Sequence, residues 1–598
     1  MKIVQIYSNK KEFKDVHFNE HLNIILGEVK DKKNTETDSH NLGKSTLISL
    51  IDFCLLKGKS DNLFLFKNYE LFIDFIFFIE LKKDDNNFVT IRRAVENNTK
   101  ICIKFHERPN QNYKENLYWD YENLALNATE KSENPRHIVT EFFSLEFHEK
   151  YDLRKLLGYF LRTQYDYDEV FKLRKYSGKL IDWKPALLDL IGFKGNLLGN
   201  KLALFNQIEV TKEYLKKMKL ELSVTDFESD VINSLIDAKI TDKQKIEEQI
   251  NSFDFYKTER EINRSLVEEI ESEISRLNSI EYRLTFEITK IKDALSRKLM
   301  FDLDKIEKIL SEVNIYFPNQ VKKKYEQLVE FNQVITQERN KYQESTLLKK
   351  NDELEKVREN LKKYNEQRME KLSALQEEDS FTKYKKYQQQ IIEIDVEINQ
   401  LLNKLEHIDI IKTINKNLDK LKKDYEAATE KLLVHLEEPN QTYIKIKNFF
   451  RELVQYILNE SSIIYFNVNK EKNPDFHAEF VNVDETKITS QSDGYSYKKM
   501  LCVCFDLAVL MTYSKSNFYH FVYHDGTFES MSDMRKIKYL QAVRHVSKKY
   551  DIQYIFTALT DDIPRDSNNQ TIQFEETEIA LVLDDRPDDL GRLFSKRF

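Results

Sequence analysis

A long stretch without glycine constrains this chain more than any other feature of its sequence. The 598 residues include 11 glycines, and none of them lies between Gly199 and Gly494. Between Pro185 and Pro439 the only proline is Pro318, which stands close to the midpoint of the stretch. Tight turns need glycine or proline, so a series of hairpins and short loops is excluded here, whereas very long helices are allowed. The sequence therefore predicts two long helical arms joined by one turn.

Apolar residues in this stretch recur at the spacing of a coiled coil. From Tyr384 to Leu405 they step alternately by three and four residues, which is a heptad seam. A similar series runs from Ile262 to Leu299, and polar residues fill most positions between. Pro318 disfavours helix at the residue before it, so we expect the chain to reverse near residues 314–320. An antiparallel coiled coil over residues 201–440 explains the central proline and the matched arms better than a generic helical rod does.

The segments on either side of this hairpin have a mixed α/β pattern. Residues 1–200 alternate expected strands with the helical segments Lys44–Leu56 and Asp152–Arg162, and residues 441–598 add the apolar helix Lys498–Tyr513. The expected strands, rich in β-branched and aromatic residues, are Ile3–Tyr7, His21–Leu26, Leu71–Leu81, Phe88–Arg93, Ile463–Asn467, Ala478–Val481, Phe518–Tyr523 and Ile552–Phe556. Because an antiparallel hairpin returns the chain to its starting point, the two half-lobes are expected to meet.

Composition excludes several classes of protein. With 41% hydrophobic and 32% charged residues, the chain is too apolar to be disordered. It has no run of about 20 apolar residues, so we expect no membrane span. The segment Met1–Ile6 resembles a strand and not a signal peptide, and four cysteines are too few for a disulfide framework, so we expect a cytoplasmic protein. Cys502 and Cys504 lack the spacing of a zinc site and are interpreted as buried thiols.

The strongest local signal of chemistry is Asn41-Leu-Gly-Lys-Ser-Thr46, which follows an expected strand and opens an expected helix. The N-terminus of a helix favours phosphate through its free N–H groups and its dipole. In this context Lys44 can reach the β- and γ-phosphates, and the Ser45 hydroxyl can ligate Mg²⁺. A chance Gly-Lys-Ser at an ordinary helix start is the alternative. The loop also departs from the usual spacing, because Asp38 stands where a glycine is expected, so we interpret residues 31–39 as a polar insertion.

Three further sites would complete a nucleotide centre. Ser492 and Gly494 precede an apolar helix, where a Ser-x-Gly turn can present its hydroxyl and N–H groups to phosphate or act as a simple N-cap. Asp525 ends a hydrophobic strand, which places a carboxylate at the sheet edge where Mg²⁺ sits in P-loop enzymes. It is otherwise a turn residue before Gly526. Gln164 follows an expected helix and could contact the metal or the attacking water, or be an ordinary surface residue.

The order of these features resembles the SMC-like ABC ATPases, which include RecN and the double-strand-break repair hook ATPases. The resemblance covers the entire architecture. It implies an α/β P-loop ATPase head of ABC/SMC type assembled from residues 1–200 and 441–598, with the antiparallel coiled coil 201–440 inserted between them. More closely, the chain is similar to bacterial SMC-like proteins of the domain-of-unknown-function family 2326. The segments that carry this likeness are Ile6-Tyr-Ser-Asn, Asn41-Leu-Gly-Lys-Ser-Thr, Tyr316-Phe-Pro-Asn-Gln-Val and His524-Asp-Gly.

The resemblance also implies cofactors, roles and partners. ATP and Mg²⁺ would be the cofactors, with the triphosphate held by Asn41, Leu42, Gly43, Lys44, Ser45 and Thr46. Ser45, Gln164 and Asp525 would organise Mg²⁺, and Ser492 and Gly494 would contact the ATP of a second subunit in a homodimer of heads. The protein would be DNA-associated, with an accessory or effector protein from the same operon, in a multi-component bacterial genome-maintenance or anti-phage defence system.

The sequence departs from the family where hydrolysis is concerned. The broad family places a catalytic glutamate directly after the strand aspartate, but this chain has Gly526, and the nearest acidic residue is Glu529. A run from Thr557 to Thr560 stands where a switch histidine is expected. A general base must lie within about 3 Å of the attacking water or act through a relay water, which makes Glu529 the non-standard candidate and His524 the other one.

These departures leave a second function open, a nucleotide-gated scaffold or sensor with little or no hydrolysis. A small-molecule phosphotransferase is a third, but it has no use for the long coiled coil.

The net charge of −8 does not indicate a nucleic-acid binder, although local basic surface matters more than the sum. One such cluster precedes the coiled coil. Its members are Lys172, Arg174, Lys175 and Lys179, with Tyr165, Tyr167 and Tyr176 nearby. Lysine and arginine suffice for contacts with phosphate, so this cluster is a candidate DNA contact. A solvated charged face is the alternative.

Overall fold

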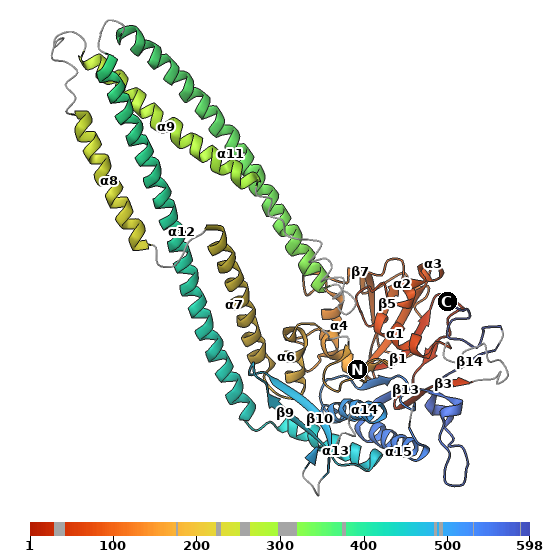
Figure 1. Ribbon diagram of the computed structural model, residues 1–598. Coiled ribbons are helices and arrows are strands. Elements are labelled where there is room, and N and C mark those ends of the chain that lie inside the picture. The colour runs from red at the N-terminus through yellow and green to blue at the C-terminus, as the bar shows by residue number, and fades with distance from the viewer. Residues whose placement is uncertain are drawn as a thin grey trace. The chain divides into compact units, whose positions relative to one another are not determined.

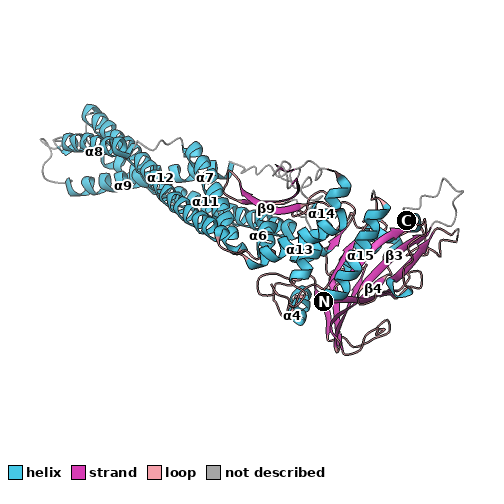
Figure 2. Cartoon of the chain, turned by 90° about the horizontal axis from the view of Figure 1, so that it is seen from below, coloured by secondary structure: helices cyan, strands magenta, loops and turns pink. Residues whose placement is uncertain are grey.

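The computed structural model describes residues 1–28, 42–174, 178–222, 229–251, 264–296, 320–372, 378–482, 487–488, 494–529, 531–586 and 588–598. They divide into two compact units. The head unit contains the described residues of Met1–Ala203 and Ala427–Phe598, and the coil unit contains those of Leu204–Lys308 and Lys324–Glu426. In Figure 1 the first and last parts of the chain, red and blue, lie side by side within the head. Figure 2 shows the strands gathered in the head and helices forming the coil.

A five-stranded parallel sheet joins the two ends of the chain. Its order is β14-β3-β13-β12-β8. The strands are β3 (Leu22–Glu28), β8 (Leu161–Arg162), β12 (Phe521–His524), β13 (Gln553–Leu559) and β14 (Ile579–Asp584). Leu559 pairs with Gly27, and His524 pairs with both Phe556 and Arg162. Since all these pairs are parallel, the carboxyl ends of the strands share one edge of the sheet, where ligands bind in α/β folds.

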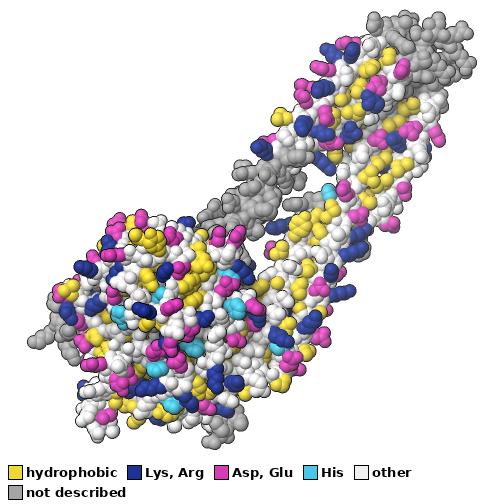
Figure 3. Space-filling model, turned by 180° about the vertical axis from the view of Figure 1, so that it is seen from behind, with side chains coloured by type: hydrophobic (Ala, Val, Ile, Leu, Met, Phe, Trp, Pro, Cys, Tyr) yellow, Lys and Arg dark blue, Asp and Glu magenta, His cyan; other side chains and the backbone are white. Residues whose placement is uncertain are grey.

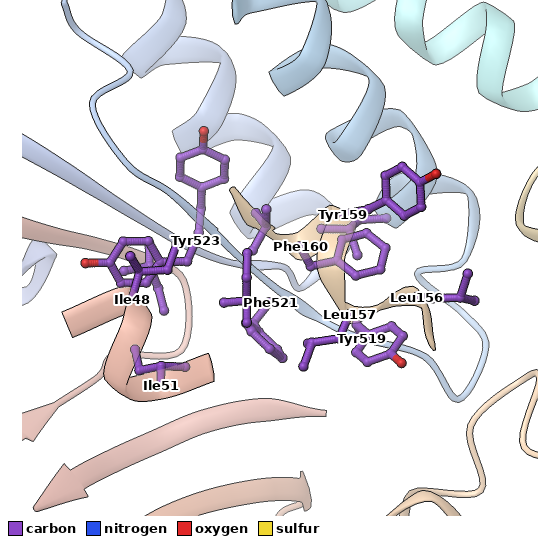
Figure 4. Close-up of a cluster of buried hydrophobic side chains, with 14 of the residues drawn as sticks. Ile48, Ile51, Leu156, Leu157, Tyr159, Phe160, Tyr519, Phe521 and Tyr523 are labelled. Atoms are coloured by element: carbon purple, nitrogen blue, oxygen red, sulfur yellow. The ribbon is translucent and has the colours of Figure 1, made fainter. Parts of the chain in front are cut away.

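Helix α1 (Lys44–Cys54) lies between this sheet and a second, antiparallel one. The second sheet has the order β2-β1-β4-β5-β6-β7. Its strands are β1 (Lys2–Ser8), β2 (Val16–His17), β4 (Ile76–Asp84), β5 (Asn87–Ala94), β6 (Lys100–His106) and β7 (Tyr121–Ala125). Figure 4 shows Ile48 and Ile51 of α1 near Phe521 and Tyr523 of β12. Because side chains alternate along a strand, His524 faces the opposite side of the sheet.

That opposite side is covered by α14 (Tyr495–Thr512), α15 (Asp533–Tyr550) and α13 (Gln441–Leu458). Every residue of α14 from Lys499 to Met511 is buried, so this helix is a central element of the head. A three-stranded sheet, with the order β11-β10-β9, contacts α13. Its strands are β9 (Ser462–Val468), β10 (Pro474–Asn482) and β11 (Lys487–Ile488). The shorter helices are α2 (Phe64–Lys67), α3 (Tyr69–Phe72), α4 (Pro135–Phe143), α5 (Arg154–Leu157), α6 (Leu180–Leu190) and three 3₁₀ turns at Gly158–Phe160, Thr560–Asp562 and Glu576–Glu578.

Two secondary-structure predictions are wrong in a way that bears on the site. The expected strand Leu71–Leu81 begins only at Ile76, after the short helix α3. The expected helix Asp152–Arg162 is a single turn, α5, followed by a 3₁₀ turn and the strand β8. Tertiary contacts decide the second case, because β8 pairs with β12 and the Arg162 side chain forms a buried ion pair with Asp506 of α14. Gln164 therefore follows a strand of the parallel sheet and not a helix.

The coil unit is an antiparallel pairing of long helices, as predicted. It is built from residues of the helices α7 (Gly195–Leu222), α8 (Ser229–Asn251), α9 (Arg264–Ser296), α11 (Gln320–Leu372) and α12 (Glu378–Glu437). On α9, Ile274 and Leu277 pack with Leu361 of α11, whereas Leu284 and Ile288 pack with Leu354.

Helices α8 and α12 also pack against each other in an antiparallel direction. Ile232 and Ile236 of α8 pack with Ile408 and Ile411 of α12, and Lys243 forms a 2.7 Å ion pair with Asp395. Residue numbers that increase along α8 thus meet residue numbers that decrease along α12. Of the turn predicted near residues 314–320, only Gln320 is described, as the first residue of α11, and the rest lies outside the described residues. Among the described helices, none has the length and apolar character needed to cross a membrane.

Candidate functional site

The turn after β3 opens helix α1 at the carboxyl edge of the parallel sheet. Gly43 is the N-cap residue and has left-handed geometry, with φ of +102°. A Cβ atom here would lie 2.6 Å from Cβ of Leu593, so a side chain would be both strained and obstructed. In the described part of the chain no side chain caps the helix, and its first N–H groups remain available to an anion.

The other predicted loop residues lie around this helix start. Leu42 is buried, Ser45 is exposed and Thr46 is half-buried, while Asn41 lies outside the described residues. The aliphatic stem of Lys44 lies against the end of β3, since its Cδ is 3.3 Å from where a Cβ on Gly27 would be. Burial lowers the pKa of Lys44, and the charges of Asp525, Asp562 and Glu529 oppose this shift. Carboxylates from separate segments therefore act on the same ammonium group.

The two carboxylate oxygens of Asp525 have different surroundings. Its Oδ1 accepts a 2.7 Å hydrogen bond from the Thr557 hydroxyl, which in turn accepts a 2.8 Å hydrogen bond from the Gly526 N–H. Its Oδ2 is buried and has no hydrogen-bond partner in the part of the chain that the structure describes. A buried carboxylate oxygen without a donor is costly, and oxygen of this kind is what Mg²⁺ prefers. The donor chemistry of Asp525 therefore fits a divalent cation.

The described residues contain no group of three or more histidine, cysteine or acidic side chains that could hold a metal ion by themselves.

Gln164 and Glu529 meet above Gly526. The Gln164 amide Nε2 donates a 2.9 Å hydrogen bond to Oε1 of Glu529. Gly526 has φ of +68°, and a Cβ there would lie 3.0 Å from the Gln164 side chain and 3.1 Å from Oε1 of Glu529. The side chain of Glu529 is 42% exposed, so its carboxylate can meet solvent. The structure thus brings Gln164 to the segment that contains Asp525 and Glu529, although Gln164 and Glu529 are 365 residues apart in the sequence.

His524, the other candidate base, lies in the core. Its Nδ1 is 2.6 Å from the Tyr554 hydroxyl and its Nε2 is 3.0 Å from Oδ2 of Asp506. Burial lowers its pKa. Both ring nitrogens therefore have partners inside the protein, and His524 cannot act on a water molecule at the sheet edge. The reason is the strand alternation that directs it toward α14.

Two residues of this centre were not selected from the sequence. Thr557 is a buried residue of β13 and bridges Asp525 and Gly526, in the region where the family resemblance led us to expect a switch histidine. Lys499, the first of the run of buried residues in α14, donates a hydrogen bond to the Gly526 carbonyl. The sequence could have suggested Lys499, because this lysine borders a run of apolar residues in one helix.

The remaining sequence candidates have mixed outcomes. Gly494 is the exposed N-cap residue of α14, while Ser492 lies outside the described residues. In the basic cluster, Lys172, Arg174 and Lys179 are exposed, but Tyr167 is fully buried. Tyr167 therefore cannot contact a nucleic acid, because its ring packs in the head beside His524. Lys175 and Tyr176 of the cluster lie outside the described residues.

Comparison with known proteins found one family model and several solved structures to which the chain is similar. The model of the bacterial family described as "Uncharacterised protein conserved in bacteria (DUF2326)" matches residues 453–598, which confirms the family resemblance over that part of the chain. Among solved structures, the Smc head domain with a coiled coil and joint derived from Pyrococcus yayanosii is similar at 14% identity and a TM-score of 0.32, over 93% of this chain and 92% of that chain.

The Smc head domain with an extended coiled coil bound to the C-terminal domain of ScpA, derived from Pyrococcus furiosus, is similar at 11% identity and a TM-score of 0.31, over 94% of this chain and 90% of that chain. No curated protein matches the chain significantly. The structure itself confirms the predicted fold class: an α/β head in which N- and C-terminal strands share one sheet, with long antiparallel helices inserted between them in the sequence.

Proposed function

We propose that the head binds ATP with Mg²⁺ at the turn Gly43–Thr46 and hydrolyses it with Glu529 as a non-standard base. The observation that carries this proposal is the buried Oδ2 of Asp525, which has no hydrogen-bond partner among the described residues, at the sheet edge where Lys44 begins α1. A phosphate-binding helix start and an acceptor for Mg²⁺ at one edge are the two elements that nucleotide binding requires.

Each residue would have a definite task. Gly43, Lys44, Ser45 and Thr46 would hold the triphosphate, with the lysine acting as a point charge. Ser45, Gln164 and Asp525 would hold Mg²⁺, which, when bound, stabilises the charge of the transferring phosphoryl group. Glu529 would accept a proton from a water molecule at its half-exposed carboxylate, while the Gln164 amide fixes the orientation of that carboxylate.

We further propose that two heads pair when ATP is bound, with Ser492 and Gly494 of each facing the nucleotide of the other. The support is the family resemblance together with the exposed position of Gly494 at the start of α14. In this proposal the protein associates with DNA and with an accessory or effector protein, in a bacterial genome-maintenance or anti-phage system. The exposed Lys172, Arg174 and Lys179 supply candidate phosphate contacts, although Figure 3 shows both charges interspersed over the visible face.

One observation favours a second function, a nucleotide-gated scaffold with little turnover. No carboxylate directly follows Asp525, and His524 is engaged in the core. In this version ATP binding alone drives pairing of the heads, and the energy of binding is used to control a partner.

The test is a titration of the purified protein with a fluorescent ATP analogue and Mg²⁺. Lys44→Ala removes hydrogen bonds to a charged ligand, so we expect a loss of about 2–3 kcal/mol, or roughly 30- to 150-fold in affinity. Lys59→Ala is the matched control, since Lys59 is an exposed lysine shortly after α1. Unchanged affinity in Lys44→Ala would contradict the site. Steady-state turnover with and without DNA, together with sedimentation at each ATP concentration, then separates the ATPase from the scaffold.

A further inference from the structure

Lys499 is a fully buried lysine next to the candidate site, and none of the steps above uses it. Its side chain is 0% exposed. Its Nζ donates a 2.6 Å hydrogen bond to the Gly526 carbonyl and lies 3.5 Å from Oε2 of Glu529. Burying an ammonium group is expensive unless it is paired and hydrogen-bonded. A lysine kept in this place therefore needs an explanation beyond packing.

The groups around this ammonium offset part of the cost of burying its charge. The Tyr495 ring centroid lies 4.9 Å from Nζ and the Tyr167 centroid lies 5.5 Å from it, distances at which an aromatic face attracts a cation. Burial lowers the pKa of Lys499, whereas the carboxylates of Glu529 and Asp525 oppose that shift. The ammonium is thus enclosed by one carbonyl, one carboxylate and two aromatic rings.

Gly526 allows Lys499 and Glu529 to meet. Its left-handed backbone brings the chain over Gln164 and Glu529 so closely that a Cβ atom would touch both. Oε1 of Glu529 accepts the hydrogen bond of Gln164, and Oε2 faces Lys499. The two oxygens of this carboxylate are therefore held by two different side chains.

We propose that Lys499 is a positioning residue for hydrolysis: by holding both the Gly526 carbonyl and the Glu529 carboxylate, it fixes the base at the sheet edge beside Asp525. This inference rests on the proposed function. It assigns to α14 a direct part in orienting the base. It also explains how Glu529, three residues after the position where the family has its catalytic glutamate, can be held in a fixed position.

The test measures ATP affinity and turnover separately in Lys499→Met. Methionine keeps the length of the side chain and removes the charge and the donor. We expect the affinity for the fluorescent ATP analogue to stay within about twofold, and kcat to fall about 30- to 100-fold, since a correctly placed general base contributes about 100-fold or more. Lys548→Met is the matched control, because Lys548 is an exposed lysine in the last turn of α15.

A double variant distinguishes positioning from a general structural effect. In a Glu529→Gln background, Lys499→Met should lower kcat no further, because the group that it positions is already inactive. Lys499→Gln is the second variant if Lys499→Met does not fold, since glutamine still donates a hydrogen bond but carries no charge.

If Lys499→Met or Lys499→Gln turns over ATP as fast as the unmodified protein, the role of Lys499 is overturned but the proposed function is not. The same holds if Lys499→Met lowers kcat in the Glu529→Gln background as much as it does in the unmodified protein. If the unmodified protein binds ATP but its turnover does not exceed that of Lys44→Ala, the proposal that the head hydrolyses ATP is overturned, and the role of Lys499 with it. A protein that does not bind ATP overturns the proposed function itself.

Discussion

The Thr557 hydroxyl donates a 2.7 Å hydrogen bond to Oδ1 of Asp525 and, at the same oxygen, accepts one of 2.8 Å from the Gly526 N–H. One side chain of β13 thereby fixes the carboxylate that would hold Mg²⁺ and the backbone turn beneath Gln164 and Glu529. Since Thr557 is 2% exposed, water cannot replace these bonds.

Thr557→Val tests this relationship. Valine has nearly the same shape but leaves the Gly526 N–H without its partner, so the free energy of unfolding should fall by about 1–3 kcal/mol. We also expect weaker Mg²⁺-dependent ATP binding, because Asp525 loses the bond that orients it. Denaturant unfolding and nucleotide titration at several Mg²⁺ concentrations measure the two effects. Thr571→Val, at an exposed threonine, is the control, and equal stability of both variants would contradict the assigned role.

Gly526→Glu tests whether the usual family residue can be restored. A glutamate at this position would meet the Gln164 side chain and Glu529, and it would have to adopt a left-handed φ of +68°. The backbone alone costs about 1–2 kcal/mol for a residue with a Cβ. We expect a lower midpoint of denaturant unfolding and no gain in turnover.

Gly199→Ala is the contrasting control for this substitution. A Cβ at Gly199 would make only ordinary contacts at 3.8 Å with Pro185, and alanine is favoured over glycine inside a helix. This variant should be neutral or slightly stabilised. A Gly526→Glu protein of undiminished stability would show that the turn is not constrained in the way described.

His520 predicts how stability depends on pH. Burial, aided by the charge of the N-terminal amine, lowers the pKa of His520 to about 4. The unfolded chain therefore binds more protons than the folded one between about pH 4 and the ordinary histidine pKa of about 6.5. The contribution of this group is present in full above pH 6.5 and is lost as the pH falls toward 4.

The free energy of unfolding, measured across this range, should decline less steeply in His520→Gln than in the unmodified protein. His545→Gln, at an exposed histidine of α15, is the matched control for the replacement of a histidine by glutamine. Equal slopes in His520→Gln and the unmodified protein would mean that His520 titrates alike in the folded and unfolded chains.

Patterns that are local in the sequence predicted most of the architecture. The heptad spacing predicted that the long helices pair, because burying an apolar stripe requires a partner at the same spacing. The central Pro318 and the matched arms predicted the antiparallel direction, which α9 and α11 have. The Gly-Lys-Ser turn predicted the start of α1 at Lys44, since the signal consists of adjacent residues. The hydrophobic run before Asp525 likewise predicted a strand ending in a carboxylate.

The sequence by itself thus determined the class of fold, the glycine turn that opens α1 and the strand that ends before Asp525, all of which follow from neighbouring residues. Only the tertiary structure decided which residues stand around that carboxylate. β8 is two residues long and forms because β12 lies beside it, which moves Gln164 to the sheet edge. The meeting of Gln164, Glu529 and Lys499 depends on a left-handed glycine and on a helix 27 residues earlier in the chain, and contacts of that kind leave no periodic signal in a sequence.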